Sequence, residues 1–257
     1  MTDVIVEQVS QALNAYTDPY LGKNLEELGF VKSVDVDAGA VSVILEFPYL
    51  VSGISGAIKQ MLTSTIEDIA GVDKVSITVD QLIKPSKSPN SLPVMNKVKN
   101  IIAIASGKGG VGKSTVSVNF ALALAAEGAR VGILDADIYG PSVGMMLGVA
   151  EGTRPEVKEG KYFIPVEAHG VQSMSMAYLV TEDTPMVWRG PMVSGALQQL
   201  LTQTLWDDLD YLIIDTAAGI SDMVLAFFNA SHQLLVVACD ERSSLTAAYA
   251  LIKVIVL

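Results

Sequence analysis

The sequence of 257 residues has little cysteine, histidine or aromatic content: one cysteine, two histidines and 6% aromatic residues. The lone Cys239 excludes an intrachain disulfide and a Cys-x-x-Cys metal knuckle built by one chain. Basic residues are also scarce, because 17 Lys and Arg stand against 28 Asp and Glu, a net charge of −11. No nucleic-acid partner is therefore expected, and a nucleotide would have to be bound at a local site.

Long apolar runs are missing too. The least polar stretches, residues 190–206 and 223–239, are interrupted by polar side chains and fall short of the roughly 20 apolar residues that a spanning helix needs. Residues 1–7 carry acids where a signal peptide requires a basic and then an apolar segment. Half of the residues are hydrophobic, so we expect a folded cytoplasmic protein for which a membrane partner is disfavoured.

Residues 1–83 have the periodicities of a small αββαβ domain. Apolar residues recur at helical spacing from Ile5 to Tyr16 and again over 54–69. Alternation at period two before and after the turn at 37–40 predicts a hairpin, and residues 75–79 alternate as a further strand. Residues 84–100, with three prolines and no apolar period, are predicted to be a linker.

The remaining residues, 101–257, alternate between apolar strands and helical segments. Strands are predicted at 101–105, 130–135, 211–215 and 234–238. Such short apolar runs are typical of a parallel sheet covered on both faces. We therefore expect an α/β fold, a three-layer α/β/α domain with a mostly parallel sheet, preceded by the small αββαβ domain.

The end of this region is predicted to be a helix packed on the sheet. Its apolar face consists of Leu245, Ala248, Tyr249, Ile252 and Val256. The single basic residue on this helix, Lys253, is too few for a membrane-surface helix. Cys239, which follows an apolar strand, is expected to be a buried small hydrophobe.

A glycine-rich loop carries the strongest chemical signal. Its residues match G-x-x-x-x-G-K-[ST] between a predicted strand and a predicted helix, the context of a phosphate-binding loop: Gly107, Lys108, Gly109, Gly110, Val111, Gly112, Lys113, Ser114 and Thr115. Glycines allow backbone N–H groups to surround a polyphosphate, Lys113 adds charge between the β- and γ-phosphates, and Ser114 offers a hydroxyl to Mg²⁺. ATP and Mg²⁺ are the expected ligands, and the three-layer α/β/α domain is therefore expected to be a P-loop NTPase.

Acidic residues end two of the predicted strands, where ligands bind in open parallel sheets. Asp215 follows the apolar run of a Walker B strand, so its carboxylate is expected near Mg²⁺, and Gly219 could present its N–H to the γ-phosphate. Asp135 and Asp137 end another strand. The alternative for these acids is that they cap the turns that follow.

Lys108 makes the loop resemble the deviant Walker A motif of the MinD/ParA/Mrp group of ATPases. In that group the early lysine reaches the phosphates of a partner subunit, and a solvated surface lysine is the alternative here. The resemblance implies catalytic roles for Lys108 and Lys113, a water-orienting role for Asp137, and a position near the metal for Asp135.

Longer stretches of the second region closely resemble the Mrp/ApbC family of iron-sulfur cluster carrier ATPases, at 106–115, 134–149 and 186–215. The N-terminal αββαβ unit, with Asp18-Pro19-Tyr20-Leu21, resembles the iron-sulfur assembly domain that such proteins often carry. The resemblance implies a homodimeric Mg-ATPase that holds an iron-sulfur cluster between subunits and passes it to apo-proteins or assembly factors. Trp188 to Pro191 also resemble a family motif, a turn that leads into a helix.

Two departures keep other functions open. The stretch after Asp215 resembles FlhG/MinD-type ATPases, which implies a nucleotide-switched regulator that recruits a partner. The sequence also stops at Leu257, before the segment in which Mrp proteins carry Cys-x-x-Cys, so the usual cluster ligands are absent and a truncated, poorly active product is a further alternative. Two copies of Cys239 would supply two thiolates against the four usual for a [4Fe–4S] cluster.

Overall fold

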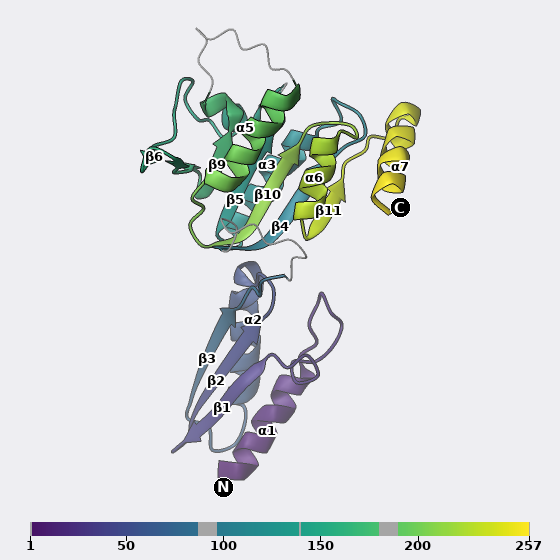
Figure 1. Ribbon diagram of the computed structural model, residues 1–257. Coiled ribbons are helices and arrows are strands. Elements are labelled where there is room, and N and C mark those ends of the chain that lie inside the picture. Colours follow the sequence, from purple (N-terminus) through teal and green to yellow (C-terminus); the bar gives the residue numbers. More distant parts are fainter. Residues whose placement is uncertain (1, 87–96, 139, 180–189, 257) are drawn as a thin grey trace. The chain divides into compact units, whose positions relative to one another are not determined.

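The computed structural model describes residues 2–86, 97–138, 140–179 and 190–256. It divides into two compact units, Met1–Lys84 and Pro85–Leu257 (Figure 1). Among the described residues, no helix combines the length and the apolar character needed to cross a membrane. The predicted linker falls largely on residues 87–96, which lie outside the described part of the chain.

The first unit is a three-stranded sheet covered by two helices. Strand β2 is central, antiparallel to β1 and parallel to β3. Alternate residues of β2, from Val41 to Phe47, are buried, and they pack against Val9 and Leu13 of α1 and Leu62 of α2. The elements are α1 (Thr2–Ala15), β1 (Val31–Asp37), β2 (Ala40–Phe47), α2 (Ser52–Glu67) and β3 (Lys74–Gln81).

The second unit is built on a six-stranded sheet of order β11-β4-β10-β5-β9-β8. All neighbours in it are parallel except β8 and β9. Its elements are β4 (Val98–Ala105), α3 (Lys113–Ala126), β5 (Val131–Ala136), α4 (Val143–Met146), β6 (Val157–Lys158), β7 (Tyr162–Phe163), β8 (Val166–Ala168), β9 (Val171–Ser175), η2 (Met176–Tyr178), α5 (Gly190–Gln203), β10 (Leu209–Thr216), α6 (Asp222–Ala230), β11 (Gln233–Val236) and α7 (Arg242–Val256).

Helices cover both faces of this sheet, which confirms the predicted α/β fold with a mostly parallel sheet. One face of β10, with Leu212 and Ile214, belongs to a core that includes Leu200 of α5 and Phe227 of α6. The alternate residues of β10 face α3, because Asp215 bonds to the side chain of Ser117 on that helix. Figure 1 shows α5 and α6 on the same side of the strands.

The sheet differs from its prediction at two places. Strand β4 begins at Val98 and not at residue 101, because Val98 and Asn100 pair with β10 and extend the strand into the predicted linker. Strands β8 and β9 were not predicted. Four of the five residues of β9, Val-Gln-Ser-Met-Ser, are buried, and two of these four are serines. Hydrophobic periodicity therefore gave no signal for this strand.

Helix α7 also corrects an expectation. The helix forms where predicted, but Leu245, Tyr249, Ile252 and Val256 of the predicted packing face are exposed, and Ala248 alone is buried. The side of α7 that packs on the unit carries Ser244, Ala248 and Leu251. The helix therefore contacts the domain through a narrow face made partly of small residues, and most of its apolar face is open.

Candidate functional site

The glycine-rich loop lies between the end of β4 and the start of α3. Gly110 and Gly112 have φ angles of +79° and +86°, values that only glycine adopts without strain. Gly112 is the N-cap of α3, and that helix begins at Lys113. A Cβ atom added at Gly109, Gly110 or Gly112 would meet no atom within 4 Å. The loop thus leaves the N-terminus of α3 accessible to an anion, as in phosphate-binding loops.

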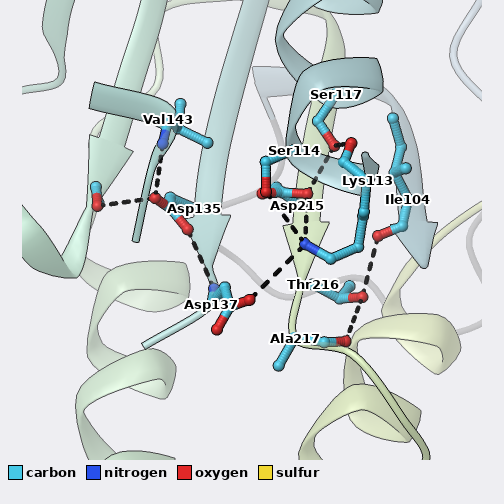
Figure 2. Close-up of polar contacts among 11 residues, drawn as sticks. Ile104, Lys113, Ser114, Ser117, Asp135, Asp137, Val143, Asp215, Thr216 and Ala217 are labelled. Atoms are coloured by element: carbon cyan, nitrogen blue, oxygen red, sulfur yellow. Dashed lines mark hydrogen bonds and ion pairs between the residues drawn. The ribbon is translucent and has the colours of Figure 1, made fainter. Parts of the chain in front are cut away.

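The ammonium group of Lys113 is the centre of the site (Figure 2). Its Nζ lies 2.8 Å from Asp215 Oδ1 and 4.0 Å from Asp137 Oδ2. It also lies 3.5 Å from Ser114 Oγ. The side chain of Lys113 is almost fully buried and that of Asp215 completely so. The structure therefore brings the loop, the end of β5 and the end of β10 together at one lysine.

Asp215 has one oxygen that is paired and one that is not. Its Oδ1 accepts hydrogen bonds from Lys113 Nζ and, at 2.7 Å, from Ser117 Oγ. Its Oδ2 is buried and has no hydrogen-bond partner among the residues that the structure describes. Leaving a buried carboxylate oxygen unpaired is costly, so this atom marks a place where a ligand, a metal-bound water or a metal ion would be accommodated.

Asp135 lies beside Asp215 in the register between β5 and β10. Its carboxylate accepts hydrogen bonds from the N–H groups of Asp137 and Val143 and from the hydroxyl of Ser175. Burial, followed by the charge of Asp215, raises the pKa of Asp135 to about 7. Because Asp135 fixes the backbone of Asp137 and the start of α4, its position serves the shape of the site as well as its charge.

Lys108 bonds within its own chain. Its Nζ lies 3.0 Å from both carboxylate oxygens of Glu241, the residue before α7, and 2.7 Å from Ser243 Oγ in the first turn of α7. The exposed fractions of the Lys108 and Glu241 side chains are 40% and 58%. This lysine of the loop is thus paired with an acid of its own chain.

Helix α7 and the residues before it also pack closely on the loop at two further points. A Cβ atom on Gly107 would lie 2.3 Å from the backbone carbonyl of Ala247, so only glycine fits there. The thiol of Cys239 lies 3.6 Å from the carbonyl oxygen of Val111. Cys239 is exposed, which shows that the expected burial is wrong: β11 ends at Val236, and the cysteine lies in the loop that follows.

Other predicted residues have less direct positions. Thr115 is exposed in the first turn of α3. The N–H of Gly219 donates to the carbonyl oxygen of Ser106 at 2.9 Å, so in this structure it is used to join β10 to the loop. Trp188 and Arg189 lie outside the described residues.

Sequence reasoning missed Ser117, Ser175, Glu241 and Ser243. Ser117 carried one usable signal, its position four residues after Lys113, which places both side chains on one face of a helix. The contacts of Ser175, Glu241 and Ser243 depend on residues far away in the chain, and no local pattern indicates them.

The site fits Mg²⁺ held together with a nucleotide. Among the described residues, no three His, Cys, Asp or Glu side chains gather into a metal cage. Mg²⁺ does not need one, because it commonly binds through one or two carboxylates together with substrate phosphates. The unpaired Oδ2 of Asp215 and the hydroxyl of Ser114 are groups of the right chemistry. An all-cysteine cluster site does not fit, since the sequence has a single cysteine.

Comparison with known families matches both units. The sequence model of the ParA family, described as NUBPL iron-transfer P-loop NTPase, matches residues 97–255. The chain belongs to this family of P-loop NTPases. A second model, for iron-sulfur cluster assembly proteins, matches residues 6–79. The predicted resemblance to iron-sulfur cluster carrier ATPases is therefore confirmed.

Individual relatives agree. The chain is similar to the iron-sulfur cluster carrier protein of Pseudomonas fragi, with 60% identity over 165 residues, 64% of this chain and 58% of that protein. The carrier protein of Escherichia coli K12 is 45% identical over 217 residues, 84% of this chain and 58% of that protein. The chain thus spans less than two thirds of the length of these relatives.

A solved structure agrees with the fold. It is a nucleotide-binding protein from Archaeoglobus fulgidus in complex with ADP, 30% identical, with a TM-score of 0.51 over 63% of this chain and 64% of that chain.

Proposed function

We propose that this chain binds and hydrolyses ATP with Mg²⁺ and that it acts, as a homodimer, in carrying iron-sulfur clusters to apo-proteins or assembly factors. The observation that carries the proposal is the buried contact between Lys113 and Asp215, beside an unpaired carboxylate oxygen, at the mouth of a glycine-rich loop. Its cytoplasmic location stays a prediction from the sequence.

Each residue of the site has a role in this proposal. Lys113 exchanges Asp215 for the β- and γ-phosphates when ATP binds, and the loop N–H groups surround the phosphates. Ser114 and Asp215 would hold Mg²⁺, which would neutralise phosphate charge. Asp137, whose Oδ2 lies 4.0 Å from Lys113 Nζ, orients the attacking water. Lys108 leaves Glu241 and contacts the phosphates of the nucleotide that is bound to the partner subunit.

The cluster is the cargo in this proposal, and the thiols available for it are few. The sequence supplies Cys239 alone, and its exposed Sγ lies next to the loop at Val111. Two copies of the chain would bring two thiolates, whereas cysteine-ligated clusters are usually held by four. Any cluster carried by this chain therefore needs ligands from a recipient, a donor or a small thiol.

Turnover of Mg-ATP by the purified chain tests the first part of the proposal. Lys113→Ala and Lys108→Ala variants should each lose turnover, with Lys161→Ala, a lysine near β7, as a charge-matched control that keeps it. Equal turnover in the wild type and the Lys113→Ala variant would contradict the proposed site, because the activity would then not depend on the loop lysine.

Anaerobic reconstitution with iron and sulfide tests the second part. We expect the wild type to retain iron together with a thiol donor such as glutathione, and to transfer it to an apo-ferredoxin. ATP-dependent dimerisation without any retained iron would instead favour the nucleotide-switched regulator that the sequence after Asp215 resembles.

A further inference from the structure

One carboxylate oxygen of Asp215 accepts hydrogen bonds from two donors on the same helix. Lys113 Nζ and Ser117 Oγ, both on α3, lie 2.8 Å and 2.7 Å from Asp215 Oδ1. Ser117 and Asp215 are both fully buried, and Figure 2 shows the two donors converging on the carboxylate. The second oxygen, Oδ2, is buried, and no described residue forms a hydrogen bond with it. The carboxylate is thus fixed on one side and available on the other.

The Ser117 hydroxyl has two acceptors within reach and one proton to donate. It lies 3.0 Å from the carbonyl oxygen of Lys113, one helical turn earlier, and 2.7 Å from Asp215 Oδ1. Hydrogen bonds to a carboxylate are shorter and stronger than those to a neutral carbonyl. The proton therefore goes to Asp215, and the bond to the sheet prevails over the local bond within the helix.

Binding of a nucleotide removes one of the two donors. A P-loop lysine moves to the phosphates when they are present, so Lys113 must give up Oδ1 of Asp215. Ser117 has no such competing ligand, because it lies inside the unit and one turn beyond the loop. Its hydroxyl can keep holding Oδ1 while the lysine is engaged elsewhere.

We propose that Ser117 is the positioning residue for Asp215: it holds Oδ1 so that Oδ2 faces Mg²⁺ or a metal-bound water in the nucleotide complex. This inference rests on the proposed nucleotide site and deepens it. Since Ser117 lies on the helix that starts at Lys113, it also ties the carboxylate of β10 to the loop that binds the phosphates. Ser117 touches neither phosphate nor metal in this proposal.

The test measures ADP affinity in the presence and absence of Mg²⁺, with a fluorescent ADP analogue as the probe. Ser117→Ala should reduce the gain in affinity from Mg²⁺ on the order of tenfold, the value of one hydrogen bond to a charged group, and leave Mg²⁺-free affinity unchanged. Ser117→Thr should restore the gain. Asn119→Ala is the matched control, because it removes a side-chain bond to the backbone of the same helix.

Two results would overturn the inference. One is an unchanged Mg²⁺ effect in the Ser117→Ala variant; the other is an equal loss of affinity with and without Mg²⁺, which a merely structural role would give. If the alanine variant fails to fold, Ser117→Cys, which keeps most of the volume with a weak donor, is judged by the same two criteria. If Mg²⁺ did not change the ADP affinity of the wild type, the proposed function would be overturned together with the inference. Failure of the proposed function is thus seen in the wild type, whereas failure of the inference alone is seen only in the Ser117 variants.

Discussion

Lys108 and Glu241 form an ion pair between the glycine-rich loop and the segment before α7, with the lysine Nζ 3.0 Å from each carboxylate oxygen. The two residues are 133 positions apart in the chain. A hydrogen bond from Ser243 and then the charge of Lys108 lower the pKa of Glu241. The lysine that is proposed to reach a partner subunit is therefore paired with a carboxylate of its own chain.

Removing this acid should favour association in the presence of ATP. In the Glu241→Gln variant Lys108 loses its competing carboxylate, so we expect ATP-dependent dimerisation to strengthen a few-fold. Sedimentation velocity at several protein concentrations, with and without ATP, measures it. Asp240→Asn removes the same charge from the neighbouring position and is the control. Equal association of both variants would show that the effect comes from net charge and not from the release of Lys108.

Gly107 should be required for α7 to pack on the loop. An added Cβ would lie 2.3 Å from backbone atoms of Ala247, which cannot move without displacing the helix. We expect Gly107→Ala to lower the free energy of unfolding of the second unit by about 1–3 kcal/mol, the usual cost of overpacking. Chemical denaturation followed by circular dichroism measures it.

Gly109→Ala is the matched control for that experiment. Its added methyl would meet no atom within 4 Å, so its effect on stability should stay within about 0.5 kcal/mol. Equal losses in the two variants would mean that the close contact between Gly107 and α7 does not exist in solution.

Contiguous patterns explain what the sequence could predict. The glycine-rich loop, the strands that end in Asp135 and Asp215, and the first unit are each encoded by neighbouring residues whose spacing determines their local structure. The parallel register then brings Asp135 and Asp215 together. Prediction of the residue set around Lys113 therefore needed little information from distant parts of the chain.

The rest depends on contacts that local patterns do not specify. The periodicity of α7 indicates an apolar face but not which side of the helix packs on the domain. In the structure the packed side carries the small residues Ser244 and Ala248. Cys239 is exposed because β11 ends earlier than its apolar residues suggest. The hydrogen bond between Ser117 and Asp215 joins residues 98 positions apart, and no sequence pattern around Ser117 indicates that Asp215 is its partner.

Asp135 should make the second unit less stable as the pH rises. Its pKa is raised to about 7 by burial and by Asp215, above the ordinary value near 4. The folded state therefore binds the proton of Asp135 more tightly than the unfolded state does. The resulting contribution of Asp135 to the free energy of unfolding is complete below about pH 4 and is lost as the pH rises to 7. Asp135→Asn removes the ionisation, and at pH 8 the variant should be more stable than the wild type by about 1–2 kcal/mol.

Denaturation of the ligand-free chain at pH 5, 6, 7 and 8 checks this. The stability difference between Asp135→Asn and the wild type should grow with pH across that range. Ser175→Ala removes a hydrogen bond that lowers the pKa of Asp135, so it should shift the loss of stability toward higher pH. Parallel stability curves for the wild type and the Asp135→Asn variant would show that Asp135 does not titrate in this range.

The open apolar face of α7 should tolerate polar substitution. Leu245, Tyr249 and Ile252 are 52%, 63% and 45% exposed, and they follow one another at four- and three-residue steps along one side of the helix. A variant with Gln at all three positions should have a free energy of unfolding within about 1 kcal/mol of that of the wild type. It should also associate less at high concentration, because an exposed apolar patch promotes self-association.

Leu251→Ala is the comparison that gives this prediction its meaning. Leu251 lies on the same helix but is fully buried, and truncating such a side chain costs about 2–5 kcal/mol. Light scattering and denaturation of both variants measure association and stability together. If the triple glutamine variant lost as much stability as Leu251→Ala, the exposed side of α7 would have to be packed in solution, and the helix would contact the unit through a wider face than the one around Ala248.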